Sequence, residues 1–244
     1  MSGQLVANGM VLRMIAQTIT PRVQQWLRST RSARVLHLFD EVCTLANERD
    51  EVVSLVSPAI GRGPFAAVLE GDFTSGLDID QPISIHSSRQ ALRVGPLVVD
   101  TIGSAVWQPK PHWSRLRRAD IARWPSAAGL PADIAASLEL TLEGNVTDEP
   151  VTCAAGVARL VGRGGGLTAT GDDALVGILY GLWVWYPRKR RRRLEEWMAM
   201  IVEAAVPRTT ILSANFLRAA ADGEAVWQWH DLVNGSPDSV GRIL

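Results

Sequence analysis

Cysteine is scarce in this chain of 244 residues, which contains only Cys43 and Cys153. Two cysteines are too few for a disulfide framework or for a structural zinc site built on thiolates. The four histidines show no metal-ligand spacing that would supply the missing ligands. We therefore expect neither a disulfide scaffold nor a zinc centre, and we expect the histidines to be surface or packed residues.

An excess of charge is also missing, since 25 lysine and arginine residues balance 25 aspartate and glutamate residues. A neutral chain has no global field to attract nucleic acid or an anionic membrane. The one basic run, RKRRRR at 188–193, contains no aromatic residues, and Arg191 and Arg192 each precede a glutamate by four residues. We expect a solvated helix junction or a docking patch for an acidic partner, and no nucleic-acid interface.

Long hydrophobic runs are absent as well. The longest uncharged apolar run, residues 174–186, has 13 residues, whereas a membrane-spanning helix needs about 20. This run predicts a buried helix instead. The first residues, MSGQLVANGM, lack a basic segment followed by an apolar one, so we expect a cytoplasmic protein without a membrane segment.

The chain as a whole predicts an α+β fold in three parts. Residues 1–33 are expected to form an N-terminal helical arm, because Leu12, Ile15, Ala16 and Ile19 fall on one helical face before Pro21. Residues 34–112 contain short Val-, Ile- and Leu-rich runs about ten residues apart, typical of a small antiparallel barrel or sandwich.

Residues 113–244 are expected to form a helical domain. Its clearest element has apolar residues at steps of three and four, namely Leu194, Trp197, Met198, Ile201, Val202 and Ala205. A second helix is expected to end at Asn234 and Gly235. Of the nine tryptophans, most are expected to pack in the core, while Trp107 and Trp113 border the two regions and are candidates for lining a cleft.

The most unusual stretch is LVGRGGGLTATGDDALVGIL at 160–179, where Gly162, Gly164, Gly165 and Gly166 come within five positions. Each glycine costs about 1 kcal/mol relative to alanine in a helix or strand, so this stretch predicts a loop whose backbone approaches something closely. It is not a Walker loop, because Asp172 occupies the position of the required lysine. The spacing of a Rossmann fingerprint is met only loosely.

Two explanations of this loop remain open. In the first, Thr168 or Thr170 caps a helix, with Asp172 and Asp173 in its first turn and a capping box between Thr170 and Asp173. One capping box needs only one acid, however, and neighbouring helical residues point about 100° apart. The second explanation is therefore a site for a small anionic substrate, in which backbone N–H groups bind an oxyanion and the carboxylates bind Mg²⁺ or an amide group.

The segment GRGGGLTATGDDALVG resembles the Gly-x-Gly-Leu-Thr-Pro-Ser-Gly-Asp-Asp signature of the family of the third, smaller subunit of oxamate carbamoyltransferase. Ala169 stands where proline is usual, and Thr170 replaces serine. The segments NERDEVVSLVSPAIGRGPFAAVL and RTTILSANFLRAAADGE resemble two further family segments in order and spacing. Together the three resemblances span about residues 34–235.

The resemblance implies transfer of a carbamoyl group from a ureido acid such as oxalurate to phosphate, which yields oxamate and carbamoyl phosphate in allantoin and purine breakdown. It also implies two partners, an acyl-CoA-synthetase-like subunit and a second subunit. The binding residues expected on the signature are Gly164, Gly165, Gly166, Thr168, Thr170 and Gly171, with Asp172 and Asp173 as candidates for acid–base work or a Mg²⁺ ion.

Two weaker candidates and one alternative function complete the predictions. Arg208, Thr209, Thr210 and Ser213 are expected either to form a second anion contact or simply to cap a helix. Asn47 and the glycines near Arg62 either face a cleft or form an ordinary turn. The alternative function is a non-catalytic anion-binding or scaffold subunit, because such a loop serves binding as well as chemistry.

Overall fold

The computed structural model describes residues 11–80, 82–86, 90–116, 131–186 and 190–235. The chain divides into two units, Met1–Gln108 and Pro109–Leu244. Within the described residues the first unit holds every strand and one helix, and the second unit is helical. The predicted α+β class with a C-terminal helical region is thus confirmed.

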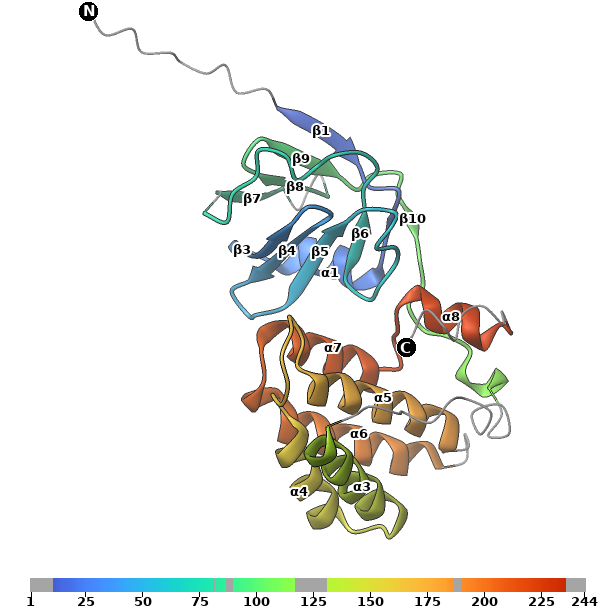
Figure 1. The fold of residues 1–244 in the computed structure, drawn as a ribbon. Helices are drawn as coiled ribbons and strands as arrows, with labels where there is room; N and C mark the ends of the chain where they lie inside the picture. Colours follow the sequence, from blue (N-terminus) through green and yellow to red (C-terminus); the bar gives the residue numbers. More distant parts are fainter. Residues whose placement is uncertain (1–10, 81, 87–89, 117–130, 187–189, 236–244) are drawn as a thin grey trace, which may run out of the picture. The chain divides into compact units, whose positions relative to one another are not determined.

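The first unit contains two sheets (Figure 1). One sheet has the order β1 (Leu12–Ile15), β9 (Leu97–Asp100), β8 (Ala91–Val94) and β7 (Ile83–His86). The other has the order β10 (Ala105–Val106), β2 (Thr18–Ile19), β6 (Ala66–Val68), β5 (Val52–Val56), β4 (Val42–Asn47) and β3 (Ala33–Phe39). The pairs β1–β9, β2–β10 and β5–β6 are parallel. The sheets are therefore mixed rather than antiparallel, and as described they form no closed barrel.

Residues 12–19 differ from the expected helical arm, because they form β1 and β2. On the helical interpretation Ile15 would be buried, but it is 64% exposed. Backbone pairing of β1 with β9 and of β2 with β6 and β10 binds this segment into both sheets. A short apolar run is compatible with the spacing of a helix and with that of a strand. Pairing with strands far along the chain therefore decides that residues 12–19 are extended.

Helix α1 (Pro21–Ser29) begins at the proline that was expected to end a helix. Thr20 is its N-cap and accepts a hydrogen bond from the backbone N–H of Val23, and proline is well suited to the first helical position. The helix buries Val23, Trp26 and Leu27 in a core shared with residues of both sheets.

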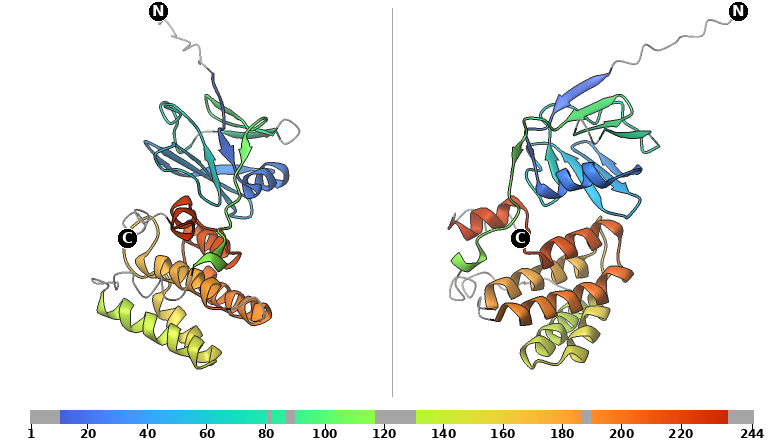
Figure 2. Two further views of the ribbon diagram at one scale, coloured as in Figure 1. Left: turned by 90° about the vertical axis from the view of Figure 1, so that its right-hand side faces the viewer. Right: turned by 180° about the vertical axis from the view of Figure 1, so that it is seen from behind.

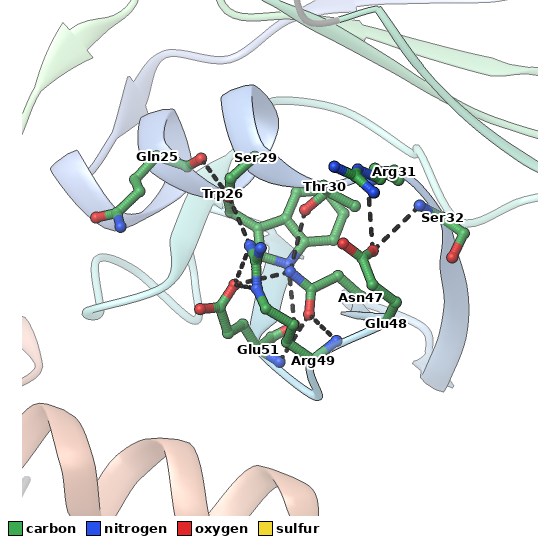
Figure 3. Close-up of polar contacts among 10 residues, drawn as sticks. All are labelled: Gln25, Trp26, Ser29, Thr30, Arg31, Ser32, Asn47, Glu48, Arg49 and Glu51. Atoms are coloured by element: carbon green, nitrogen blue, oxygen red, sulfur yellow. Dashed lines mark hydrogen bonds and ion pairs between the residues drawn. The ribbon is translucent and has the colours of Figure 1, made fainter.

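Asn47 fixes the turn between β4 and β5 (Figure 3). The side chain is completely buried and makes four hydrogen bonds. Its Nδ2 donates to Thr30 Oγ1 and Glu51 Oε2, and its Oδ1 accepts from the backbone N–H groups of Arg49 and Glu51. Every polar atom of this side chain is thus used inside the first unit, which favours the ordinary turn over a binding role.

The second unit consists of packed helices (Figure 2). They are α3 (Ala132–Val146), α4 (Pro150–Leu160), α5 (Thr170–Trp185), α6 (Arg191–Ala205), α7 (Ile211–Ala221) and α8 (Trp227–Val233), with short 3₁₀ turns at Trp113–Arg115 and Val206–Arg208. None of these described helices is long and apolar enough to cross a membrane.

The predicted apolar patterns of this unit correspond to buried faces. The run at 174–186 lies in α5, and the stripe from Leu194 to Ala205 lies in α6, where only Val202 of the six residues is not fully buried. Trp113 is a core residue, because its ring stacks on Tyr180 at 5.1 Å and its Nε1 donates to the carbonyl oxygen of Gly223. The helix α8 ends at Asn234 as predicted.

Candidate functional site

The glycine-rich loop, residues 161–169, joins α4 to α5 in the second unit. Helix α5 begins at Thr170, and its N-cap is Ala169, which offers no side-chain hydrogen bond. The expected threonine cap and the capping box between Thr170 and Asp173 are therefore wrong. The loop lies back against the first turn of α5 instead, since the N–H of Gly171 donates to the carbonyl oxygen of Arg163 at 2.8 Å.

Asp172 holds this arrangement together. Its side chain is only 1% exposed, although it lies in the first turn of a helix. Oδ1 accepts a hydrogen bond of 2.9 Å from the backbone N–H of Gly162, and Oδ2 accepts one from the hydroxyl of Thr209. A buried carboxylate costs free energy unless its oxygens are satisfied. Here they are satisfied by two segments that precede and follow α5, so Asp172 positions both of them.

Asp173 has a different environment, although it is the next residue. Its side chain is exposed, and its Oδ2 accepts a hydrogen bond of 3.2 Å from the hydroxyl of Thr168. Partial desolvation raises the pKa of this carboxyl, the Thr168 hydroxyl opposes the rise, and the neighbouring charge of Asp172 adds to it. Asp173 is thus the carboxylate of the pair that remains available to a ligand.

Two glycines of the signature are required by close contact. A Cβ at Gly171 would lie 1.9 Å from the carbonyl oxygen of Leu160, so only glycine fits where the start of α5 contacts the end of α4. Gly164 has a φ of +96°, and a Cβ there would come within 2.6 Å of Thr170 Oγ1. The loop conformation therefore depends on glycine at both positions.

Gly164, Gly165 and Gly166 lie within the exposed part of the loop, residues 162–167. Among the described residues, none accepts a hydrogen bond from their backbone N–H groups. Arg163, also exposed, directly precedes them and forms no ion pair with any described residue. Backbone N–H groups of a glycine-rich loop beside a cation suit an anionic oxygen, so the loop has donors to offer a phosphate or carboxylate.

The second candidate segment divides into residues with different roles. Thr209 contacts Asp172, as described above, and therefore joins the site. Thr210 is the N-cap of α7, where its Oγ1 accepts a hydrogen bond from the N–H of Ser213. Ser213 is 1% exposed, so its hydroxyl is not on the surface. Arg208 is exposed, and its carbonyl oxygen lies next to Gly162.

Of the carboxylate pair expected to bind Mg²⁺, only Asp173 is exposed to an ion from solvent. Both oxygens of Asp172 already accept hydrogen bonds, and the side chain is buried, so only Asp173 offers a free carboxylate. Within the described residues, no group of three histidine, cysteine or acidic side chains is placed to hold a metal. Mg²⁺ is commonly held by one or two carboxylates together with waters and substrate phosphates, so a Mg²⁺ ion on Asp173 stays a prediction.

Neither cysteine is placed as a nucleophile. Cys43 lies in the first unit and Cys153 in α4, and both are buried. Burial raises the pKa of the Cys43 thiol to about 12 and that of the Cys153 thiol to about 11. Because the thiolate is the reactive form, both side chains are inert packing residues at neutral pH.

The sequence analysis missed the part played by Gly162. Its φ of +70° turns the chain so that its N–H donates to Asp172 ten residues later. The available signal was the position of Asp172 at the start of an apolar helix. A carboxylate that is buried there needs N–H or O–H donors from nearby segments, and the glycine-rich loop is the nearest one.

Comparisons with known proteins agree with the resemblance found in the sequence. The family model described as oxamate carbamoyltransferase subunit AllH matches residues 160–239. This stretch begins at the glycine-rich loop and extends past α8, and it includes Asp172, Asp173 and Thr209. No curated protein and no solved structure matches the chain significantly. The resemblance is therefore confirmed for the part of the helical unit that carries the loop, and this part is similar to a subunit of oxamate carbamoyltransferase.

Proposed function

We propose that the chain is a subunit of a carbamoyltransferase, in which the loop at 161–169 and Asp173 bind a carbamoyl compound. The reaction would transfer a carbamoyl group from a ureido acid such as oxalurate to phosphate. A phosphate oxygen bonds to the ureido carbonyl carbon, and the bond from that carbon to the internal nitrogen, which carries the oxalyl group, breaks. The nitrogen takes the proton of hydrogen phosphate, so the products are oxamate and carbamoyl phosphate.

The observation that carries this proposal is the contrast between the two aspartates within the matched stretch. Both carboxylate oxygens of Asp172 are used in positioning the loop, whereas Asp173 is exposed and contacts Thr168 of the same loop, whose glycine N–H groups have no described acceptor. A carbamoyl phosphate has two parts that suit these two kinds of group. Its phosphate accepts hydrogen bonds from the loop amides, and its NH₂ group donates to a carboxylate.

Partner subunits are part of the proposal. The described residues near the loop include no serine–histidine or cysteine–histidine pair, and one anion-binding loop cannot hold a phosphate and a developing oxyanion at the same time. We therefore expect an acyl-CoA-synthetase-like subunit and a second subunit to complete the active site. A chain that binds the anion but contributes no chemistry is the alternative function, supported by the same loop.

The test is carbamoyl phosphate formation from oxalurate and phosphate by three preparations: the chain alone, the chain with partner subunits, and the partners with the Asp173→Asn variant. The proposal expects turnover only with partners and at least a tenfold loss in the variant. Full turnover with the variant would assign the chain to the non-catalytic alternative. Turnover near 1 s⁻¹ by the chain alone, in the ordinary range of enzymes, would contradict the need for partners.

A further inference from the structure

A polar pocket in the helical unit is lined by residues from the end of α3, the end of α5 and the start of α6. Its volume is about 520 Å³, and its lining includes Asn145, Asp148, Trp185, Tyr186, Arg190 and Arg193. The glycine-rich loop lies at the opposite end of α5, which has 16 residues and is therefore about 24 Å long. The pocket is thus separate from the site proposed above and does not depend on its function.

Among the described residues that line this pocket, one cation has no described counter-ion. Arg193 is neutralised, because it pairs with Asp148 and with Glu196. Arg190, the exposed N-cap of α6, makes no ion pair with any residue that the structure describes.

The start of α6 adds to this positive charge. Its first turn contains no acid, and residues 191–193 are all arginine. The N-terminus of a helix carries a positive partial charge that favours anions and disfavours cations. An anion at this end of α6 would therefore be stabilised by both Arg190 and the helix.

Asn145 provides an independent observation. The residue lines the pocket and is only 8% exposed, yet its Nδ2 has no acceptor among the described residues. Buried polar atoms are rarely left without a partner, and an unpaired N–H donor is satisfied by an acceptor oxygen, which an oxyanion supplies. An oxyanion in the pocket would therefore accept a hydrogen bond from Asn145 and pair with Arg190.

The volume of the pocket and its aromatic lining indicate what kind of molecule carries the anionic group. A pocket of several hundred Å³ accommodates an organic molecule, which is much larger than an inorganic ion. Trp185 is 51% exposed, and with Tyr186 it gives the pocket an aromatic wall. We propose that this pocket binds an organic oxyanion, with its phosphate or carboxylate group beside Arg190 and Asn145 and a planar ring against Trp185.

Calorimetric titration of the full chain tests this proposal with four probes. Adenosine monophosphate carries a ring and a phosphate, nicotinate carries a ring and a carboxylate, adenosine lacks the anion, and inorganic phosphate lacks the ring. We expect one of the two ring-bearing anions to bind at least tenfold more tightly than adenosine and than phosphate. Which of the two binds identifies the oxyanion as a phosphate ester or a carboxylate.

The variants Arg190→Gln and Arg190→Glu should weaken this binding at least tenfold, the second more than the first. Arg192→Gln is the matched control, because the Arg192 side chain is 93% exposed, pairs with Glu196 and does not line the pocket. The control should bind as the wild type does. No binding of either ring-bearing anion, equal binding of adenosine, or equal losses in the Arg190 and Arg192 variants would overturn the proposal.

Discussion

Thr209 donates its hydroxyl hydrogen to Oδ2 of Asp172, although 37 positions separate the two residues. With the hydrogen bond from Gly162, this contact ties the entry to α7 and the glycine-rich loop to the first turn of α5. The two aspartates of the signature therefore divide their work. Asp172 positions the loop, and Asp173 is the exposed carboxylate to which we assign the ligand in our proposal.

The first prediction concerns stability. Asp172→Asn replaces one acceptor oxygen with an NH₂ group, which faces the donor of Gly162 or that of Thr209. We expect the free energy of unfolding of the helical unit to fall by about 1–3 kcal/mol, the usual cost of an unsatisfied buried group. Urea denaturation followed by circular dichroism measures the change. Asp173→Asn is the control, and an equal loss in both variants would contradict the division of roles.

The second prediction concerns Gly171. Alanine at this position would place its Cβ against the carbonyl oxygen of Leu160, so Gly171→Ala should displace the loop and destabilise the helical unit by about 1–3 kcal/mol. Gly177 lies in the same helix with open space around its Cα. Gly177→Ala should therefore be neutral or stabilising by up to about 1 kcal/mol. Thermal melts of the two variants compare these effects, and similar melting temperatures would refute the close contact.

The third prediction follows from the raised pKa of Asp173. Between the ordinary value of 3.8 and the higher folded-state value, the folded chain binds the proton more tightly than the unfolded chain does. Stability contributed by the protonated form is then lost as the pH rises through this window. Asp173→Asn should melt at or above the wild-type temperature at pH 7, and the difference should disappear below the ordinary value. A variant that melts lower at pH 7 would contradict the desolvated position.

The fourth prediction concerns the basic run. Arg191 pairs with Glu195, Arg192 with Glu196, and Arg193 with Asp148 and Glu196. Most of the described cations therefore already have carboxylate partners, which leaves little charge for phosphate backbones. We expect no retention on a duplex DNA column at about 150 mM salt. Retention that weakens steeply with added salt would point to a nucleic-acid partner instead.

The sequence was most informative where structure is local. The apolar stripe of α6 and the apolar run of α5 predicted their helices, because the spacing of apolar residues along the sequence shows which face of a helix is buried. Residues 12–19 were misassigned, since their strands exist only through pairing with residues 97–106 and with β6. Such pairing leaves no trace in local periodicity.

For the candidate site, too, the sequence indicated what is local and missed the contacts between distant segments. The composition of the loop and the Gly-Asp-Asp sequence identified the site region without any structure. They did not distinguish Asp172 from Asp173, because that difference depends on Thr209 from a distant segment. The pocket around Asn145 and Arg190 was not predicted either, since the end of α3 meets the later helices α5 and α6 there.

The most direct test of the proposed site is calorimetric binding of phosphonoacetamide, a stable analogue with the amide and phosphonate groups of carbamoyl phosphate. The wild-type chain, Asp173→Asn and Asp133→Asn are compared, and inorganic phosphate is titrated in parallel. Asp133 is the control because it is an exposed acid in the first turn of α3 in the same unit. The account predicts that Asp173→Asn weakens analogue binding at least tenfold, leaves phosphate binding unchanged or tighter, and that Asp133→Asn changes neither. Equal analogue binding by all three proteins, or none by the wild type, would contradict it.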